Sequence, residues 1–126
     1  MLQQLSIDNY ILIPHLKLTF SKGFTCITGE TGAGKSILVG ALSLLTGQRA
    51  DTSVLRETNK KCIIEGTFDV KEYGLKYLFD TNDLDYEEQT VFRREINQQG
   101  KSRAFINDTP VTLSVMKEIG AKLLDI

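Results

Sequence analysis

The segment at residues 29–36 constrains the fold of this chain more than any other, because it matches the glycine-rich pattern G-x-x-x-x-G-K-[ST]. This pattern connects a buried strand to the N-terminus of a helix. Residues 24–28 read as a short buried strand, and apolar residues recur at helical spacing after the loop, at Ile37, Leu38, Ala41, Leu42 and Leu45. The order strand, loop, helix predicts an α/β fold of the P-loop NTPase type.

Each residue type in the loop has a physical reason to hold a nucleoside triphosphate. Glycines let backbone N–H groups turn toward a polyphosphate, Lys35 adds positive charge at the β- and γ-phosphates, and the Ser36 hydroxyl can coordinate Mg²⁺. The loop alone points to ATP or GTP with Mg²⁺. The predicted nucleotide-binding residues are Gly29, Glu30, Thr31, Gly32, Ala33, Gly34, Lys35 and Ser36.

Length and charge exclude several classes of protein. The chain has 126 residues, enough for one domain, and a net charge of -1, so no global basic field indicates nucleic-acid binding. No apolar stretch approaches the length of a membrane span, and we expect no membrane partner. Cys26 and Cys62 both fall in predicted strands, which favours reduced core cysteines and a cytoplasmic protein.

Alternating and helical patterns predict the remaining elements. Strands are expected at residues 2–8, 16–20, 61–70, 90–96 and 102–106, the last two as a hairpin, and residues 9–14 as a connection. Residues 48–59 read as a polar connection with a short helical turn, residues 72–79 as a short helix, and residues 81–88 as a solvated acidic loop. A second turn is expected at Asn107-Asp108, and Thr112 is the expected N-cap of a final helix. The inward positions of that helix would be Leu113, Met116, Ile119, Gly120 and Leu123, and residues 124–126 would enter another strand.

Together these residues resemble the N-terminal part of the RecN family of bacterial DNA repair proteins, relatives of the SMC-type ATPases within the ABC class. The resemblance covers the whole chain and is carried by Leu5-Ser6-Ile7-Asp8-Asn9-Tyr10, the loop 29–36, Gly47-Gln48-Arg49-Ala50-Asp51, Arg93-Arg94-Glu95-Ile96 and residues 100–107. The loop fits many families, whereas residues 100–107, followed by Pro110-Val111, are more specific. Two departures are small: Asp108 stands where the family commonly has Gly, and His15 lies at a variable position.

The resemblance implies that residues 1–126 are an N-terminal fragment of an ABC/SMC-type ATPase head, a single incomplete domain with an antiparallel β layer. In that family, coiled-coil arms separate two halves of the head. The second half supplies the Ser-Gly-Gly signature, the Walker B Asp with its catalytic Glu, and a switch His. The sequence of residues 1–126 contains none of these. The resemblance therefore implies ATP binding with no catalytic residue in the fragment, which alone is predicted to be inactive although the full-length protein is an ATPase.

Partners also follow from the resemblance. It implies association with the C-terminal half of the same head and homodimers in which two heads sandwich ATP. It also implies that the full-length protein acts on DNA in double-strand-break repair and recombination and is associated with the nucleoid. Two other functions stay open. A small-molecule P-loop kinase would need an acceptor pocket and lid arginines after the last helix. A non-catalytic nucleotide-dependent dimerisation module would be complete at residue 126.

Basic residues outside the loop have two interpretations each. By the resemblance, Arg49 occupies the position of an arginine near the nucleotide and the dimer interface, but it equally fits a solvated polar loop. Arg93, Arg94, Lys101 and Arg103 fall on the predicted hairpin and could contact DNA phosphates, although a charged outer face is favoured. Arg93 and Arg94 point to opposite faces of a strand, so at most part of this set forms one patch. His15 lies beside Pro14 in a predicted turn, and we expect no Cys or carboxylate to be placed there to build a metal or catalytic site.

Overall fold

The computed structural model describes residues 1–20 and 32–124, and for residues 32–35 it describes the backbone alone. One antiparallel sheet has six strands in the order β2-β1-β3-β4-β5-β6. Its strands are β1 Leu2–Tyr10, β2 Ile13–Thr19, β3 Cys62–Asp69, β4 Gln89–Ile96, β5 Ser102–Ile106 and β6 Thr109–Val111. The helices are α1 Gly32–Leu45, α2 Lys76–Thr81 and α3 Leu113–Leu123, with a 3-10 turn, η1, at Thr52–Val54.

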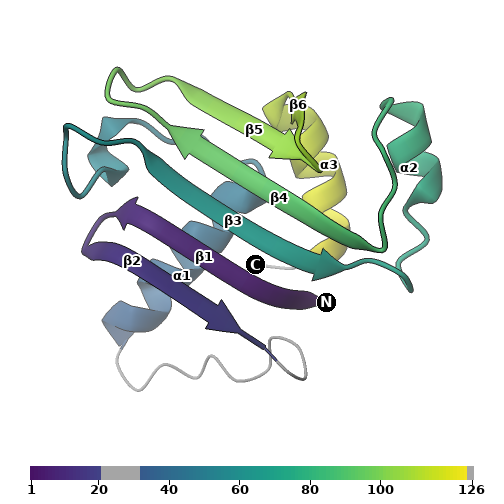
Figure 1. Cartoon of the computed structure of the whole chain (residues 1–126), viewed down its shortest axis with the longest axis horizontal. Helices are drawn as coiled ribbons and strands as arrows, with labels where there is room; N and C mark the ends of the chain where they lie inside the picture. The colour runs from purple at the N-terminus through teal and green to yellow at the C-terminus, as the bar shows by residue number, and fades with distance from the viewer. Residues whose placement is uncertain (21–31, 125–126) are drawn as a thin grey trace.

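Two helices cover one face of the sheet. In Figure 1, α1 runs behind β1, β3 and β4, and α3 lies behind β4 and β5. Strand β3 shows why the sheet has an inner and an outer face, since its residues alternate between buried and partly buried positions along its whole length. The core forms between the inner face and the apolar sides of both helices, and includes Ile64, Phe68 and Phe92 from strands, Leu42 and Leu45 from α1, and Met116 and Ile119 from α3.

Close contact between α1 and the sheet depends on Gly66 of β3. A β-carbon at this position would lie 2.7 Å from Leu45 Cδ1 and 3.2 Å from a ring carbon of Phe68. Real β-carbons do not approach other atoms so closely, so the side chain of Leu45 would have to shift. The absence of a side chain at Gly66 therefore leaves room for Leu45 of α1 to pack on β3.

Most predicted elements are confirmed. The structure contains β3, the β4–β5 hairpin, the polar connection with its short turn η1, and α3 with Thr112 as its N-cap, whose hydroxyl accepts a hydrogen bond from Val115 N. Met116, Ile119, Gly120 and Leu123 are buried, and Leu113 packs at the edge of the core. Cys62 is a buried free thiol. The predicted strand at residues 24–28, Cys26 and the expected strand entry at residues 125–126 lie outside the described residues.

The expected connection at residues 9–14 is wrong. Pairing between β1 and β2 continues through Asp8 with His15 and Tyr10 with Ile13, so only two residues turn the chain. Asn9 stays within β1 although its φ is 55°, because its side chain is hydrogen-bonded to the backbone of Glu57. Pro14 is tolerated because β2 is an edge strand, where a missing N–H costs no pairing.

Two other boundaries differ from the prediction. The helix expected over residues 72–79 begins later, as α2, because Gly74 adopts a positive φ of 63°. Strand β6 was not expected at all. Asn107 and Asp108 have φ values of 49° and 65°, the geometry of a two-residue hairpin turn, and β6 returns alongside β5. With only 3 residues, β6 is too short to give a recognisable alternating pattern.

Candidate nucleotide-binding site

The predicted loop leads directly into helix α1. Gly29, Glu30 and Thr31 lie outside the described residues, whereas Gly32, Ala33, Gly34 and Lys35 have helical backbone and Ser36 is exposed in the first turns of the helix. The first N–H groups of a helix have no partner within it and carry the positive end of the helix dipole. No acidic residue lies in the first turn of α1. This end of the helix therefore has the amides and the polarity that a phosphate group requires.

The core holds α1 in a fixed position beneath the sheet. Ala41, Leu42 and Leu45 are at most 1% exposed. A β-carbon on Gly40 would lie 2.6 Å from the Tyr10 hydroxyl, so the side chain of Tyr10 from β1 reaches the helix at this position. This packing orients the N-terminus of α1 and, with it, the backbone of the predicted phosphate-binding residues.

Arg94 binds the C-terminal end of α1. Its guanidinium donates hydrogen bonds to the carbonyl oxygens of Leu44 and Gln48, both at 2.7 Å, and to the Ser102 hydroxyl. The side chain is fully buried, and desolvation lowers the pKa of Arg94 from its ordinary value. A cation at the C-terminal end of a helix is favourable because the free carbonyls there are negative.

The interpretation of Arg94 as part of a charged outer face is therefore wrong. The alternation of β4 places Arg94 on the inner face, between the buried residues Phe92 and Ile96. The opposite orientations predicted for Arg93 and Arg94 are confirmed. The sequence does not reveal that carbonyl oxygens at the C-terminal end of α1 lie on the inner face. These oxygens accept hydrogen bonds from Arg94.

Arg93 lies on the outer face among carboxylates. Its guanidinium is 3.2 Å from Glu95, 3.4 Å from Asp108 and 3.9 Å from Glu65, and it stacks over the ring of Phe105 at 4.5 Å. These carboxylates neutralise its charge. Lys101 and Arg103 are exposed. The four basic residues of the hairpin therefore do not form a single positive patch.

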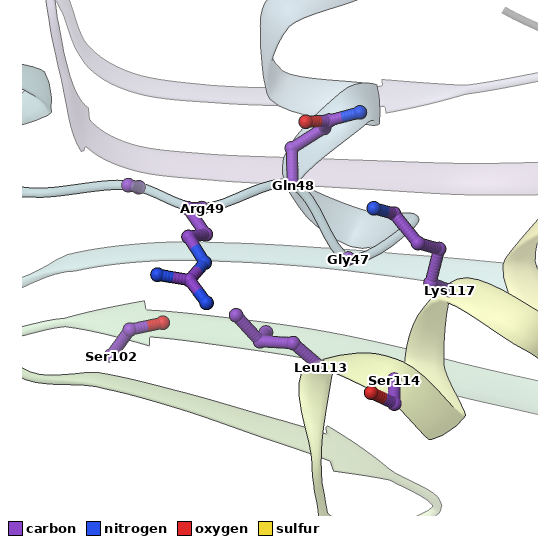
Figure 2. Close-up of a pocket in the computed structure, with 8 residues that line it drawn as sticks. Gly47, Gln48, Arg49, Ser102, Leu113, Ser114 and Lys117 are labelled. Carbon is purple, nitrogen blue, oxygen red and sulfur yellow. The ribbon is translucent and has the colours of Figure 1, made fainter.

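Arg49 lies beyond the C-terminal end of α1, on the opposite end of the helix from the loop. The 14-residue helix is about 20 Å long at 1.5 Å per residue. Arg49 is exposed and lines a pocket with Ser102, Leu113 and Lys117 (Figure 2). A contact between Arg49 and a nucleotide in the loop stays a prediction.

His15 has a carboxylate partner that its neighbours in the sequence do not indicate. Its Nδ1 lies 2.6 Å from Asp8 Oδ1, across the β1–β2 pair, and both side chains are well exposed. The acidic residues at 83, 85, 87 and 88 are exposed in a loop after α2, as predicted. No group of three or more His, Cys, Asp or Glu in the described parts of the chain is arranged to hold a metal.

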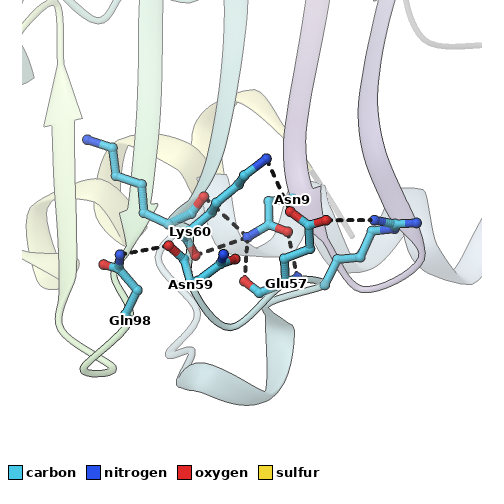
Figure 3. A network of polar contacts seen from close by, with 7 residues as sticks. Asn9, Glu57, Asn59, Lys60 and Gln98 are labelled. Atoms are coloured by element: carbon cyan, nitrogen blue, oxygen red, sulfur yellow. Dashed lines mark hydrogen bonds and ion pairs between the residues drawn. The ribbon is translucent and has the colours of Figure 1, made fainter.

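Asn9 is a structurally important residue that the local sequence pattern did not predict. It is 6% exposed, and its side-chain amide donates to the carbonyl oxygens of Glu57 and Lys60, both at 3.0 Å, while its Oδ1 accepts from Glu57 N at 2.7 Å (Figure 3). Asn9 thus anchors the connection between η1 and β3. The signal available in the sequence was an asparagine directly after the predicted strand 2–8, because asparagine adopts a positive φ more often than most residues.

The sequence matches the family described as "AAA domain" over residues 4–125. It is 42% identical over 130 residues to the DNA repair protein RecN of Haemophilus influenzae, and 41% identical over 133 residues to that of Bacillus subtilis. Both comparisons cover 100% of this chain but only 23% and 22% of the relatives, so the chain spans less than a quarter of their length.

Solved structures agree on the fold. A chain described as "Structural biochemistry of ATP-driven dimerization and DNA stimulated activation of SMC ATPases" superposes with a TM-score of 0.72 at 21% identity, over 96% of this chain and 78% of that one. The predicted fold, a lobe of an SMC-type P-loop ATPase head with an antiparallel β layer, is thereby confirmed.

In the described parts of the chain no helix has the length and apolar character needed to cross a membrane. The family match spans nearly every residue and the RecN resemblance is confirmed, so the chain belongs to the AAA domain family.

Proposed function

We propose that this chain is the ATP-holding part of an ATPase head that acts in DNA double-strand-break repair. The observation that carries the proposal is the placement of the motif residues Gly32–Ser36 at the N-terminus of a helix whose C-terminal half is held by the core and by Arg94. ATP would bind over the amides of this terminus, with Lys35 at the β- and γ-phosphates and the Ser36 hydroxyl on Mg²⁺. Gly29, Glu30 and Thr31 would complete the loop.

The resemblance extends this proposal to the rest of the protein. Residues 1–126 would form one lobe, and the C-terminal half of the same head would supply the signature segment, the Walker B Asp and the catalytic Glu. Two such heads would sandwich ATP, and the full-length protein would act on DNA in the cytoplasm, associated with the nucleoid. The RecN relatives, which are named as DNA repair proteins, and the SMC ATPase structure, whose description includes ATP-driven dimerization, support this assignment.

Isothermal titration calorimetry with MgATP tests the loop. We expect wild-type protein to bind and Lys35→Ala to lose at least about tenfold in affinity, because a charge-assisted contact contributes about 1.5–3 kcal/mol. Lys76→Ala, which removes an exposed lysine from α2, is the matched control and should bind like wild type. Equal affinities of wild type and Lys35→Ala would remove the loop from the proposal.

A further inference from the structure

A pocket lies at the end of α1 opposite the predicted nucleotide loop. Its volume is about 580 Å³, and it is formed by the connection after α1, the start of β5 and the first turns of α3. Figure 2 shows Arg49 extending from the connection toward Ser102 and Leu113, with Lys117 and Ser114 on α3. Three separate parts of the chain therefore contribute polar groups to one concave surface.

The residues that line this pocket carry a net positive charge. It contains Arg49 and Lys117 but no Asp or Glu. Neither cation has an ion pair with any residue that the structure describes. The first turn of α3 adds backbone N–H groups, and the hydroxyl of the N-cap Thr112 accepts only the one from Val115. Leu113 and Ser114 line the pocket, and because the first N–H groups of a helix have no partner within it, these two can bind an acceptor from outside the helix.

A third cation lies directly behind the pocket wall. The buried Arg94 donates to the Ser102 hydroxyl and to the Gln48 carbonyl, and both of these residues line the pocket. Arg94 has no carboxylate partner among the described residues, and its Nε has no hydrogen-bond acceptor there. A buried guanidinium without a counter-charge is costly, and an anion in the adjacent pocket would reduce that cost.

The connection after α1 is fixed against α3, so the pocket has a defined shape. Gly47 has a φ of 98°, and a β-carbon there would lie 2.9 Å from Leu113 O and 2.9 Å from Lys117 N. The backbone on either side of the pocket is therefore in contact at Gly47. Arg49 and Lys117 consequently project from surfaces whose separation is set by packing.

We propose that the pocket lined by Arg49, Ser114 and Lys117 binds a phosphate group, supplied either by the backbone of DNA or by a free nucleotide. The site is distinct from the loop at the N-terminus of α1. Arginine and the free amides of α3 would hold the phosphate oxygens directly, and Lys117 would add charge at the rim. Because the described contacts of Ser102 and Gln48 lead through Arg94 to Leu44 of α1, an occupied pocket would also be connected to the helix that carries the loop.

Amide NMR spectra of the chain at low ionic strength test this proposal, with inorganic phosphate, MgATP and a short DNA duplex as three separate probes. We expect at least one probe to shift the amide signals of residues 113–117. Arg49→Gln and Lys117→Gln should each weaken that response about tenfold, the loss expected for one charged hydrogen bond. Lys122→Gln, with the same charge change near the other end of α3, should weaken it by less than about twofold.

The three probes identify the source of the phosphate. A response to duplex DNA alone assigns a backbone phosphate, whereas a response to inorganic phosphate or MgATP that persists in Lys35→Ala assigns a free one. A MgATP response that disappears in Lys35→Ala belongs to the loop, and without a response to the other two probes it overturns the proposal. No shift at residues 113–117 with any probe, or equal losses in Lys117→Gln and Lys122→Gln, also overturns it. These outcomes are independent of whether the loop binds ATP.

Discussion

Arg94→Ala should destabilise the fold far more than any other arginine substitution on the hairpin. The buried guanidinium holds two carbonyl oxygens, those of Leu44 and Gln48, at 2.7 Å each. A hydrogen bond from a charged donor contributes about 1.5–3 kcal/mol, so losing both costs up to about 3–6 kcal/mol, and less to the extent that Leu44 O keeps its 3.2 Å bond from Gly47 N. Removing an unpaired buried charge offsets part of this loss and brings the net value toward the lower end of the range.

The matched control is Arg103→Ala on the neighbouring strand β5. Arg103 is exposed and has no ion pair within residues 1–20 and 32–124. Substitutions of this kind change stability by less than about 0.5 kcal/mol. The comparison removes the same side chain from the same hairpin, so it isolates the effect of burial and of the helix carbonyls.

Urea unfolding followed by circular dichroism measures both variants. Arg94→Ala should lower the free energy of unfolding by at least about 2 kcal/mol, a large share of the about 5–15 kcal/mol typical of a domain. Arg94→Lys should recover only part of the loss, because an ammonium group does not reproduce the planar fork that spans three acceptors. A difference between Arg94→Ala and Arg103→Ala below about 0.5 kcal/mol would refute the role assigned to Arg94.

Three other predictions concern single positions. Gly47→Ala should lower the melting temperature more than Gly74→Ala. Both glycines have positive φ, but only at Gly47 would a β-carbon meet backbone atoms, at 2.9 Å. Equal shifts in melting temperature for the two variants would contradict this. Burial raises the pKa of Cys62 to about 12 from an ordinary value of 9.0, so its contribution to stability should be complete below pH 9 and lost as the pH rises toward 12. Cys62 should also resist alkylation at pH 8 until urea unfolds the chain, and rapid labelling of folded protein would disprove its burial. Asn9→Ala should cost about 1–3 kcal/mol by leaving backbone groups of the connection unpaired, and hydrogen exchange should show faster exchange at Glu57 N, whose partner is Asn9 Oδ1.

Much of the sheet could be predicted because a two-residue period is a strong signal when one face is buried. Strand β3 alternates along its full length, and β4 keeps Thr90, Phe92 and Ile96 on the inner face. The same alternation separates Arg93 from Arg94. It could not show that Arg94 is buried, because the carbonyls that it binds belong to the end of α1 and the residues after it, 46 to 50 positions earlier in the sequence.

Local backbone geometry was the main reason for the wrong boundaries. Asn9 resembles a turn residue, but hydrogen bonds to a segment 48 to 52 positions later keep it within β1. The turn at Asn107-Asp108 was predicted, whereas β6 depends on pairing with β5 over only three residues. For the site, the motif predicted which residues would hold a nucleotide, but the pocket beside Arg49 arises from contacts between segments that no local pattern connects.

Phosphate release from ATP tests the central claim most directly, namely that this chain holds ATP but depends on another part of the head to hydrolyse it. Hydrolysis requires a positioned water and stabilisation of charge on the γ-phosphate, and the loop supplies only part of that stabilisation. We expect no release above background from residues 1–126 alone, and release when the separately expressed C-terminal half of a RecN head is added. Robust hydrolysis by this chain alone, abolished in Lys35→Ala, would contradict the account.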